Sequence, residues 1–200
     1  MKNIEGLLNR LLQVLTDVNS PLVSMLQKGI DKNTIDIKLN ELNIFLPEEV
    51  YALFNWRNGV LLTDNNTFEQ TWFFPMGSFS SIEDAIDNYQ FNAGEDGYWN
   101  EKMFMLFESG AGEMYLIDCD DKSSTYRMIF KHWAGAVDFE VITTMYDSLE
   151  SMLRTVIECF ETKVYHYDET GGYKFDFQKH VIISKRNNPD SELWKIYSQR

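Results

Sequence analysis

The apolar positions of the first 60 residues recur three or four apart, which is the spacing of amphipathic helices. Such spacing predicts a helix over residues 2–16, through Ile4, Leu7, Leu8, Leu11, Leu12 and Leu15. A short helical turn is expected over 22–27, before Gly29, and another short helix over 34–42. Apolar stripes of this kind indicate helices that pack on a common core.

The best-marked helix covers residues 47–57. Pro47 fits the first turn of a helix, and Val50, Leu53 and Phe54 form one apolar stripe. Asn58 and Gly59 tolerate positive φ and therefore supply a stop. No residue of this segment has obvious chemistry, so it is predicted to be a packing element.

The pattern changes after Gly59. A strand is expected to start at 60–62, a turn at 64–67 and an extended aromatic stretch over 68–76. The next helix begins at Ser80, whose spacing from Glu83 matches a capping box. Its predicted buried face comprises Ile82, Ala85, Ile86 and Tyr89, and a polar loop follows over 91–101.

Three strands with short connections are predicted over 102–107, 114–119 and 125–133, and residues 137–143 could add another. Sequential strands joined by short turns favour an antiparallel meander over a parallel sheet. A helix follows over 148–161, with Asp147 and Glu150 as its expected capping pair. The predicted fold class is α+β: a single domain with a largely antiparallel, possibly mixed, sheet flanked by helices.

The last 38 residues differ in pattern and charge. Residues 164–167 and 173–177 are expected to pair as a hairpin, and 190–198 to form a short last helix. This stretch is too short for a core of its own. We therefore predict a main domain over 1–162 and a C-terminal extension over 163–200 that packs on it.

The net charge of −13 is unevenly distributed along the chain. Residues 1–162 carry 11 basic and 26 acidic residues, a net charge of −15, whereas residues 163–200 carry 7 and 5, a net charge of +2. An acidic body repels nucleic acid and anionic membranes and attracts a basic protein partner. Solubility alone is an equally good explanation of such acidity at this point.

Cysteine usage and hydropathy point to the cytoplasm. Cys119 and Cys159 lie in apolar contexts without a CxxC motif, so buried thiols are expected rather than a disulfide. No run approaches the roughly 18 apolar residues of a membrane helix, and the first residues lack the apolar run of a signal peptide.

Candidate chemistry is sparse. His132, His166 and His180 have no metal-ligand spacing. Gly110 and Gly112 precede a strand instead of a helix, so they fit a turn better than a phosphate loop. The acidic run from Asp118 to Asp121 lacks the glycine and glutamate of a calcium loop. No catalytic, cofactor or metal site is therefore predicted.

The order of motifs resembles the SUKH superfamily of Smi/Knr-type regulators and bacterial toxin-immunity proteins. Six signature residues carry the resemblance: Leu46, Pro47, Asn58, Gly59, Gly112 and Asp118. The helix at Ser80 lies between Gly59 and Gly112, and the aromatic strand to Trp133 and the helix after Asp147 follow Asp118. It covers about residues 1–162, and the 163–200 extension has no counterpart in it.

The resemblance implies a binding protein that is not an enzyme and that neutralises a cognate, basic toxin such as a nuclease or deaminase. Eight residues on acidic loops are the expected contacts: Glu95, Asp96, Tyr98, Trp99, Glu108, Glu113, Asp120 and Asp121. A regulatory or scaffold module of the same fold, unrelated to toxins, is the alternative. An enzyme is a third reading, for which a deep pocket lined by carboxylates would be required.

Overall fold

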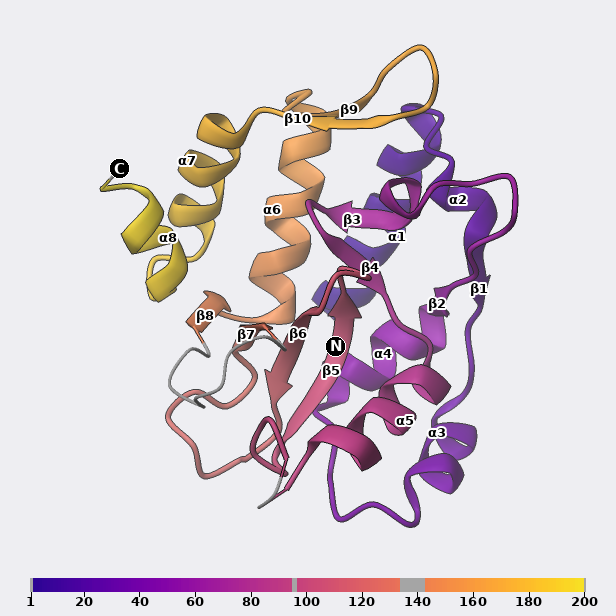
Figure 1. Cartoon of the computed structure of the whole chain (residues 1–200), viewed down its shortest axis with the longest axis vertical. Helices are drawn as coiled ribbons and strands as arrows, with labels where there is room; N and C mark the ends of the chain where they lie inside the picture. Colours follow the sequence, from indigo (N-terminus) through magenta and orange to yellow (C-terminus); the bar gives the residue numbers. More distant parts are fainter. Residues whose placement is uncertain (1, 95–96, 134–142, 200) are drawn as a thin grey trace.

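The centre of the molecule is a curled six-stranded sheet in which each strand pairs antiparallel with the next one along the chain (Figure 1). The computed structural model describes residues 2–94, 97–133 and 143–199. The strands of the sheet are β3 Trp72–Phe74, β4 Gly77–Phe79, β5 Met103–Glu108, β6 Glu113–Asp118, β7 Ile129–Trp133 and β8 Thr143–Tyr146. The predicted antiparallel meander is confirmed. Apart from Thr143, the strand expected over 137–143 lies outside the described residues.

The two faces of the sheet bury different cores. Tyr115 and Ile117 of β6 point into the main core, which the sheet shares with the helices. Leu116, between them, points to the opposite face, where it packs with Met105 and Trp99 in a small second cluster. This alternation follows from the two-residue period of a strand.

Eight α-helices are described, and α1, α4 and α6 contribute most of the helical side of the main core. Their bounds are α1 Lys2–Asp17, α2 Leu22–Met25, α3 Lys32–Leu39, α4 Glu48–Trp56, α5 Ile82–Asn92, α6 Leu149–Glu161, α7 Phe177–Asn187 and α8 Glu192–Tyr197. The helices expected over 2–16, 34–42, 47–57, 80–90 and 148–161 are confirmed within a few residues. None of the described helices is long and apolar enough to cross a membrane.

Short elements correct two expectations. The chain after α2 pairs as strand β1, Leu26–Lys28, with β2, Arg57–Val60, so the helical turn expected over 22–27 ends early. The aromatic stretch expected to be extended over 68–76 begins with a 3-10 turn, η1, over Phe68–Thr71. Within it only Trp72–Phe74 is strand. The side chain of Gln70 bonds back to the N–H of Thr67 and closes the 3-10 turn before it.

Asn58 and Gly59 do not stop helix α4, which ends at Trp56; they lie in β2 and fasten the start of α5. The Asn58 amide oxygen accepts the N–H of Ile82 at 2.9 Å, and its nitrogen donates to Glu83 at 2.9 Å. Gly59 has φ +77°, and a Cβ there would lie 2.4 Å from the backbone nitrogen of Ser81. The Asn58–Gly59 pair therefore ties β2, which directly follows α4, to the beginning of α5.

The N-caps of α5 and α6 are each one residue from the predicted position. Ser81, not Ser80, caps α5 by accepting the N–H of Asp84 at 3.1 Å. Ser148, not Asp147, caps α6 by accepting the N–H of Ser151 at 3.0 Å. Both predicted caps are themselves good capping residues, so the choice between neighbours is made by tertiary contacts.

The C-terminal residues form the expected hairpin, β9 Tyr165–Tyr167 and β10 Tyr173–Phe175, followed by α7, which was not predicted, and α8 (Figure 1). The buried His180 of α7 sits against β9, where its Nδ1 lies 2.6 Å from the hydroxyl of Tyr165. Val164, Tyr173, Val181 and Trp194 join the main core, so this segment shares its hydrophobic cluster with the sheet.

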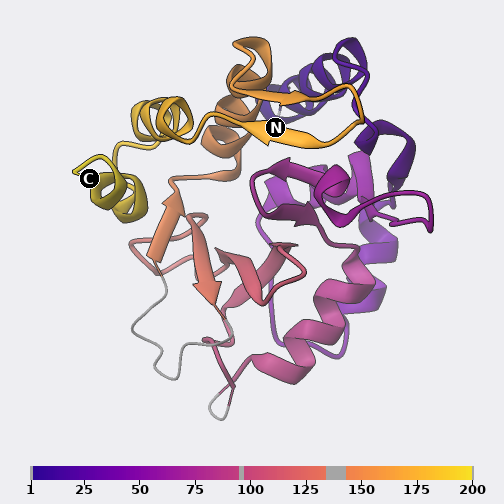
Figure 2. The same cartoon turned by 45° about the horizontal axis from the view of Figure 1, so that its top comes forward.

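These C-terminal elements lie against both outer strands of the six-stranded sheet. At β8, Ser191 Oγ donates to the carbonyl of Thr144 at 2.8 Å, and the N–H of Glu192 donates to Thr144 Oγ1 at 2.9 Å. At the other edge, the ring of Tyr173 packs edge-on against Trp72 of β3, 5.6 Å between centroids. In Figure 2 the orange hairpin runs alongside the segment that holds β3 and β4, and α8 lies beside β8.

Candidate partner-binding cleft

The loop that joins β6 to β7, residues 119–128, is built on the buried carboxylate of Asp118. This carboxylate accepts the N–H of Asp120 at 2.9 Å and the hydroxyl of Thr125 at 2.7 Å. The Asp118 carbonyl also accepts the N–H of Arg127 at 2.8 Å. Asp118, a signature residue, therefore fixes the loop conformation instead of contacting a ligand.

An ion pair between a buried carboxylate and a half-exposed arginine ties this loop to helix α4. Glu49 lies in the first turn of α4 and is buried, and its carboxylate accepts both the Nε and the Nη2 groups of Arg127. The hydrogen bond to Glu49 raises the pKa of Arg127. Arg127 has φ +74°, a backbone conformation that residues other than glycine rarely adopt. The ion pair with Glu49 therefore also holds a strained backbone in place.

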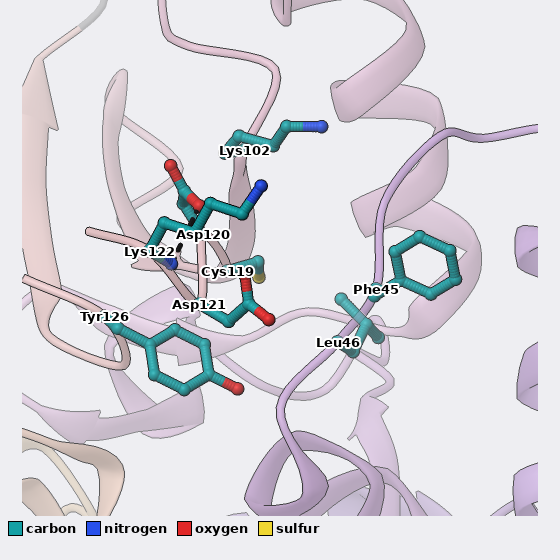
Figure 3. Close-up of a pocket in the computed structure, with 8 residues that line it drawn as sticks. All are labelled: Phe45, Leu46, Lys102, Cys119, Asp120, Asp121, Lys122 and Tyr126. Atoms are coloured by element: carbon teal, nitrogen blue, oxygen red, sulfur yellow. Dashed lines mark hydrogen bonds between the residues drawn. The ribbon is translucent and has the colours of Figure 1, made fainter.

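Between this loop and the segment that leads into α4 there is an open cleft of about 300 Å³ (Figure 3). Its walls are Phe45, Leu46, Lys102, Cys119, Asp120, Asp121, Lys122 and Tyr126. In Figure 3 the carboxylate of Asp121 and the hydroxyl of Tyr126 both point into the gap that faces Leu46. Phe45 is 85% exposed on the opposite rim. An exposed aromatic ring beside carboxylates suits contact with another protein.

The charges that line the cleft are balanced: Asp120 and Asp121 face Lys102 and Lys122. The cleft itself is therefore mixed in charge, whereas the expectation was an acidic loop surface. Cys119 also reaches the cleft, but burial raises the pKa of its thiol well above the ordinary value. The thiol is protonated at neutral pH and is a poor nucleophile.

Two further observations bear on chemistry. Within residues 2–94, 97–133 and 143–199, no three His, Cys, Asp or Glu side chains come together as a metal site would require. His132 is buried against the ring of Trp99, at 5.6 Å between centroids. Burial lowers the pKa of His132, which keeps its imidazole neutral.

The eight expected contact residues do not share one surface. Asp120 and Asp121 follow the end of β6, beside the start of β5, whereas Glu108 and Glu113 lie at the other end of the same two strands. Tyr98 lies in the loop before β5. A six-residue strand spans roughly 17–20 Å, so the two groups are separated by about that length. Glu95 and Asp96 lie outside the described residues.

Two of the expected contacts are engaged inside the molecule. Trp99 is fully buried in the second cluster, which corrects its assignment as an exposed anchor. Its neighbours in sequence looked polar, but the side chain covers the apolar face that Met105 and Leu116 present. Glu113 is ion-paired with Lys131 at 2.5 Å, and both side chains are mostly covered.

Of the cleft residues, sequence reasoning predicted Asp120 and Asp121 as contacts and missed both exposed aromatic ones, Phe45 and Tyr126. Ile44 and Leu46 are buried while Phe45 is exposed, as expected where an extended segment alternates between the core and solvent. A three-residue apolar run before Pro47 carries that signal, because an extended chain cannot bury all three side chains against one surface.

The fold is an α+β domain whose antiparallel sheet packs against helices, and an open cleft lies between the β6–β7 loop and the segment before α4. The chain belongs to the SMI1 / KNR4 family (SUKH-1), whose family model matches residues 29–155. Domains of this family are generally non-catalytic and include immunity proteins. No curated protein matches the chain. The match runs from just before α3 into α6 and leaves α1 and the C-terminal elements outside it.

Proposed function

We propose that this protein is a cytoplasmic immunity protein that neutralises a cognate, basic toxin by stoichiometric binding and not by catalysis. The family supports an immunity or SMI1-like role in general. The charge distribution supports a basic partner.

The main observation behind this proposal is the small number of Lys and Arg side chains that are left once the internal ion pairs are counted. The described side chains include 27 of the 31 carboxylates, since those at 95, 96, 138 and 140 are outside, and 16 of the 18 Lys and Arg, since those at 2 and 200 are outside. Ten described ion pairs use ten of each. Seventeen carboxylates and six cations are left without an ion pair among the described side chains.

This excess of negative charge steers a basic toxin toward the protein, and the cleft supplies the close contacts. Long-range attraction raises the association rate, which matters for an inhibitor that must outpace its toxin. At short range, Phe45 and Tyr126 offer apolar rings next to Asp120 and Asp121. Aromatic residues beside charges that become desolvated are the usual source of binding energy at such interfaces.

The test is co-expression with the toxin encoded beside the gene, combined with affinity measurement on purified proteins. We expect rescue of growth and a one-to-one complex whose affinity falls at least about tenfold in Phe45→Ser. Phe91→Ser is the matched control, because Phe91 is 81% exposed and Phe45 85%, and Phe91 does not line the cleft. Unchanged killing with no complex at micromolar concentration overturns the proposal, and equal effects of both variants overturn the choice of cleft.

A regulatory or scaffold role in the same family is the second candidate, and the balanced charge of the cleft favours it. Two carboxylates and two ammonium groups suit a partner of mixed charge as well as a basic one. The two roles differ in salt dependence: a basic toxin steered by the acidic body associates more slowly as salt rises, whereas a mixed-charge partner changes little.

A further inference from the structure

A second groove, of about 560 Å³, lies between α7 and α8, away from the cleft of Figure 3. Val181, Ile182, Pro189 and Tyr197 provide its apolar lining, and Gln178, Lys185, Arg186 and Ser198 its polar lining. The side chain of Ile182, on α7, is 65% exposed. Figure 1 shows the two helices side by side at the end of the chain.

The charge of this groove is opposite to that of the body. Two cationic side chains line it and no carboxylate does. Lys185 has no ion pair among the described side chains, and its ammonium group is held at the groove by a 2.8 Å bond to Ser198 Oγ. Arg186 is paired with Glu158 of α6 but stays exposed. An occupant therefore meets an apolar floor and positive charge at the rim.

A second copy of this chain fits the groove poorly. A symmetric dimer through the groove would bring the Lys185 and Arg186 of one copy against those of the other, and like charges repel. A head-to-tail contact, with the groove of one copy on the acidic body of the next, would assemble rings or open chains instead of a closed pair. The occupant that fits is a different molecule.

We propose that the α7–α8 groove binds an amphipathic helix of a second protein partner, one that carries carboxylates beside its apolar stripe. Apolar side chains of that helix pack on Val181, Ile182 and Tyr197, and its carboxylates pair with Lys185 and Arg186. In helix-in-groove recognition the apolar face of an amphipathic helix lies in a hydrophobic groove, and charges at the rim select between partners. The partner is thus opposite in charge to a toxin drawn by the acidic body, and no residue lines both sites.

The test is a phage-displayed library of random peptides of about 16 residues, long enough for about four helical turns, selected on the full chain. Peptides that bind the native protein are counter-selected against Ile182→Ser. We expect the retained peptides to be net acidic, with apolar residues three and four apart. Their affinity, measured by fluorescence anisotropy, should fall at least about tenfold in Ile182→Ser and in Lys185→Glu.

Matched variants separate the groove from general surface effects. Ile37→Ser is the control for Ile182→Ser, because Ile37 is a helical isoleucine that is 67% exposed elsewhere. Lys28→Glu is the control for Lys185→Glu, because Lys28 is an exposed lysine on β1 without an ion pair among the described side chains. Basic or uncharged peptides among the Ile182-dependent set, or the absence of any Ile182-dependent peptide, overturn the proposal. Self-association that Ile182→Ser abolishes also overturns it, in favour of a second copy.

Discussion

Replacing Gly59 by alanine tests the role assigned to the Asn58–Gly59 pair. Gly59 has φ +77°, and the added methyl group would lie 2.4 Å from the Ser81 nitrogen and 2.7 Å from the Ser80 carbonyl carbon. Both neighbours are backbone atoms at the beginning of α5, so they cannot move aside as a side chain can. We expect Gly59→Ala to push α5 away from β2.

Two costs add in this variant. An alanine held in the left-handed region costs about 1–2 kcal/mol, and an overpacked contact of this kind costs a further 1–3 kcal/mol, approximately. The expected loss in the free energy of unfolding is therefore roughly 2–5 kcal/mol, a large share of the approximately 5–15 kcal/mol of a typical domain.

Gly171→Ala is the matched control. Gly171 has the same φ of +77°, but the nearest atom to its added methyl is the end of the Gln70 side chain at 3.1 Å. It should therefore lose only the backbone cost of about 1–2 kcal/mol. Urea unfolding followed by tryptophan fluorescence gives both values from the midpoint at constant slope. If Gly59→Ala costs no more than Gly171→Ala, the close approach of β2 to α5 is not a constraint and our account of the pair is wrong.

Three further predictions concern buried groups. Arg127→Met leaves the carboxylate of Glu49 buried without its partner and should cost about 2 kcal/mol on urea unfolding, and adding Glu49→Gln should recover part of that loss; no recovery argues against the ion pair. Burial lowers the pKa of His180 to about 4. Above the ordinary pKa of 6.5 this imidazole is neutral in the folded and in the unfolded protein. Between pH 6.5 and 4 only the unfolded protein takes up the proton, so the free energy of unfolding falls as the pH drops. The full effect is about 3 kcal/mol; His180→Gln should flatten that slope and His166→Gln, at an exposed position, should not. Burial raises the pKa of both cysteine thiols, so native protein should react with a thiol reagent far more slowly than protein in urea; rapid labelling of the native state would contradict their burial.

The sequence was most informative where one physical effect dominates. Helix α6 was predicted nearly to the residue because Leu149, Leu153, Val156, Ile157 and Phe160 repeat at helical spacing, and all of them are buried. The β5–β6–β7 meander followed from short polar turns between apolar runs. Long periodic segments leave few alternatives.

Helix α7 was missed because its pattern is inverted. Its buried face includes His180 and Ser184, whereas Ile182 is exposed, so an apolar stripe cannot be read from the sequence. The polar side chains are tolerated inside because His180 meets Tyr165 and Ser184, at 2.6 and 3.3 Å. Neither partner can be identified from the sequence, because Tyr165 lies 15 residues before His180 and Ser184 belongs to the same unpredicted helix.

The candidate site was predicted only in part for the same reason. Asp120 and Asp121 were singled out by charge and do line the cleft. Phe45 joins them from a segment some 75 residues earlier, a meeting that no local pattern contains. Trp99, by contrast, was expected outside because its loop is polar, and only the apolar face beneath it shows why it is buried.

The contacts of the C-terminal elements with both outer strands have a consequence for synthesis. The ribosome makes the chain from its N-terminus, at roughly 5–20 residues per second. All six strands of the sheet are complete by Tyr146, before the segment around Ser191 that bonds to β8 and the Tyr173 that packs on β3 have been made. During that interval the unpaired edges can join the strands of other nascent chains. Synthesis of the segment through Glu192 therefore shortens the exposure of these edges, because Tyr173, Ser191 and Glu192 then cover them.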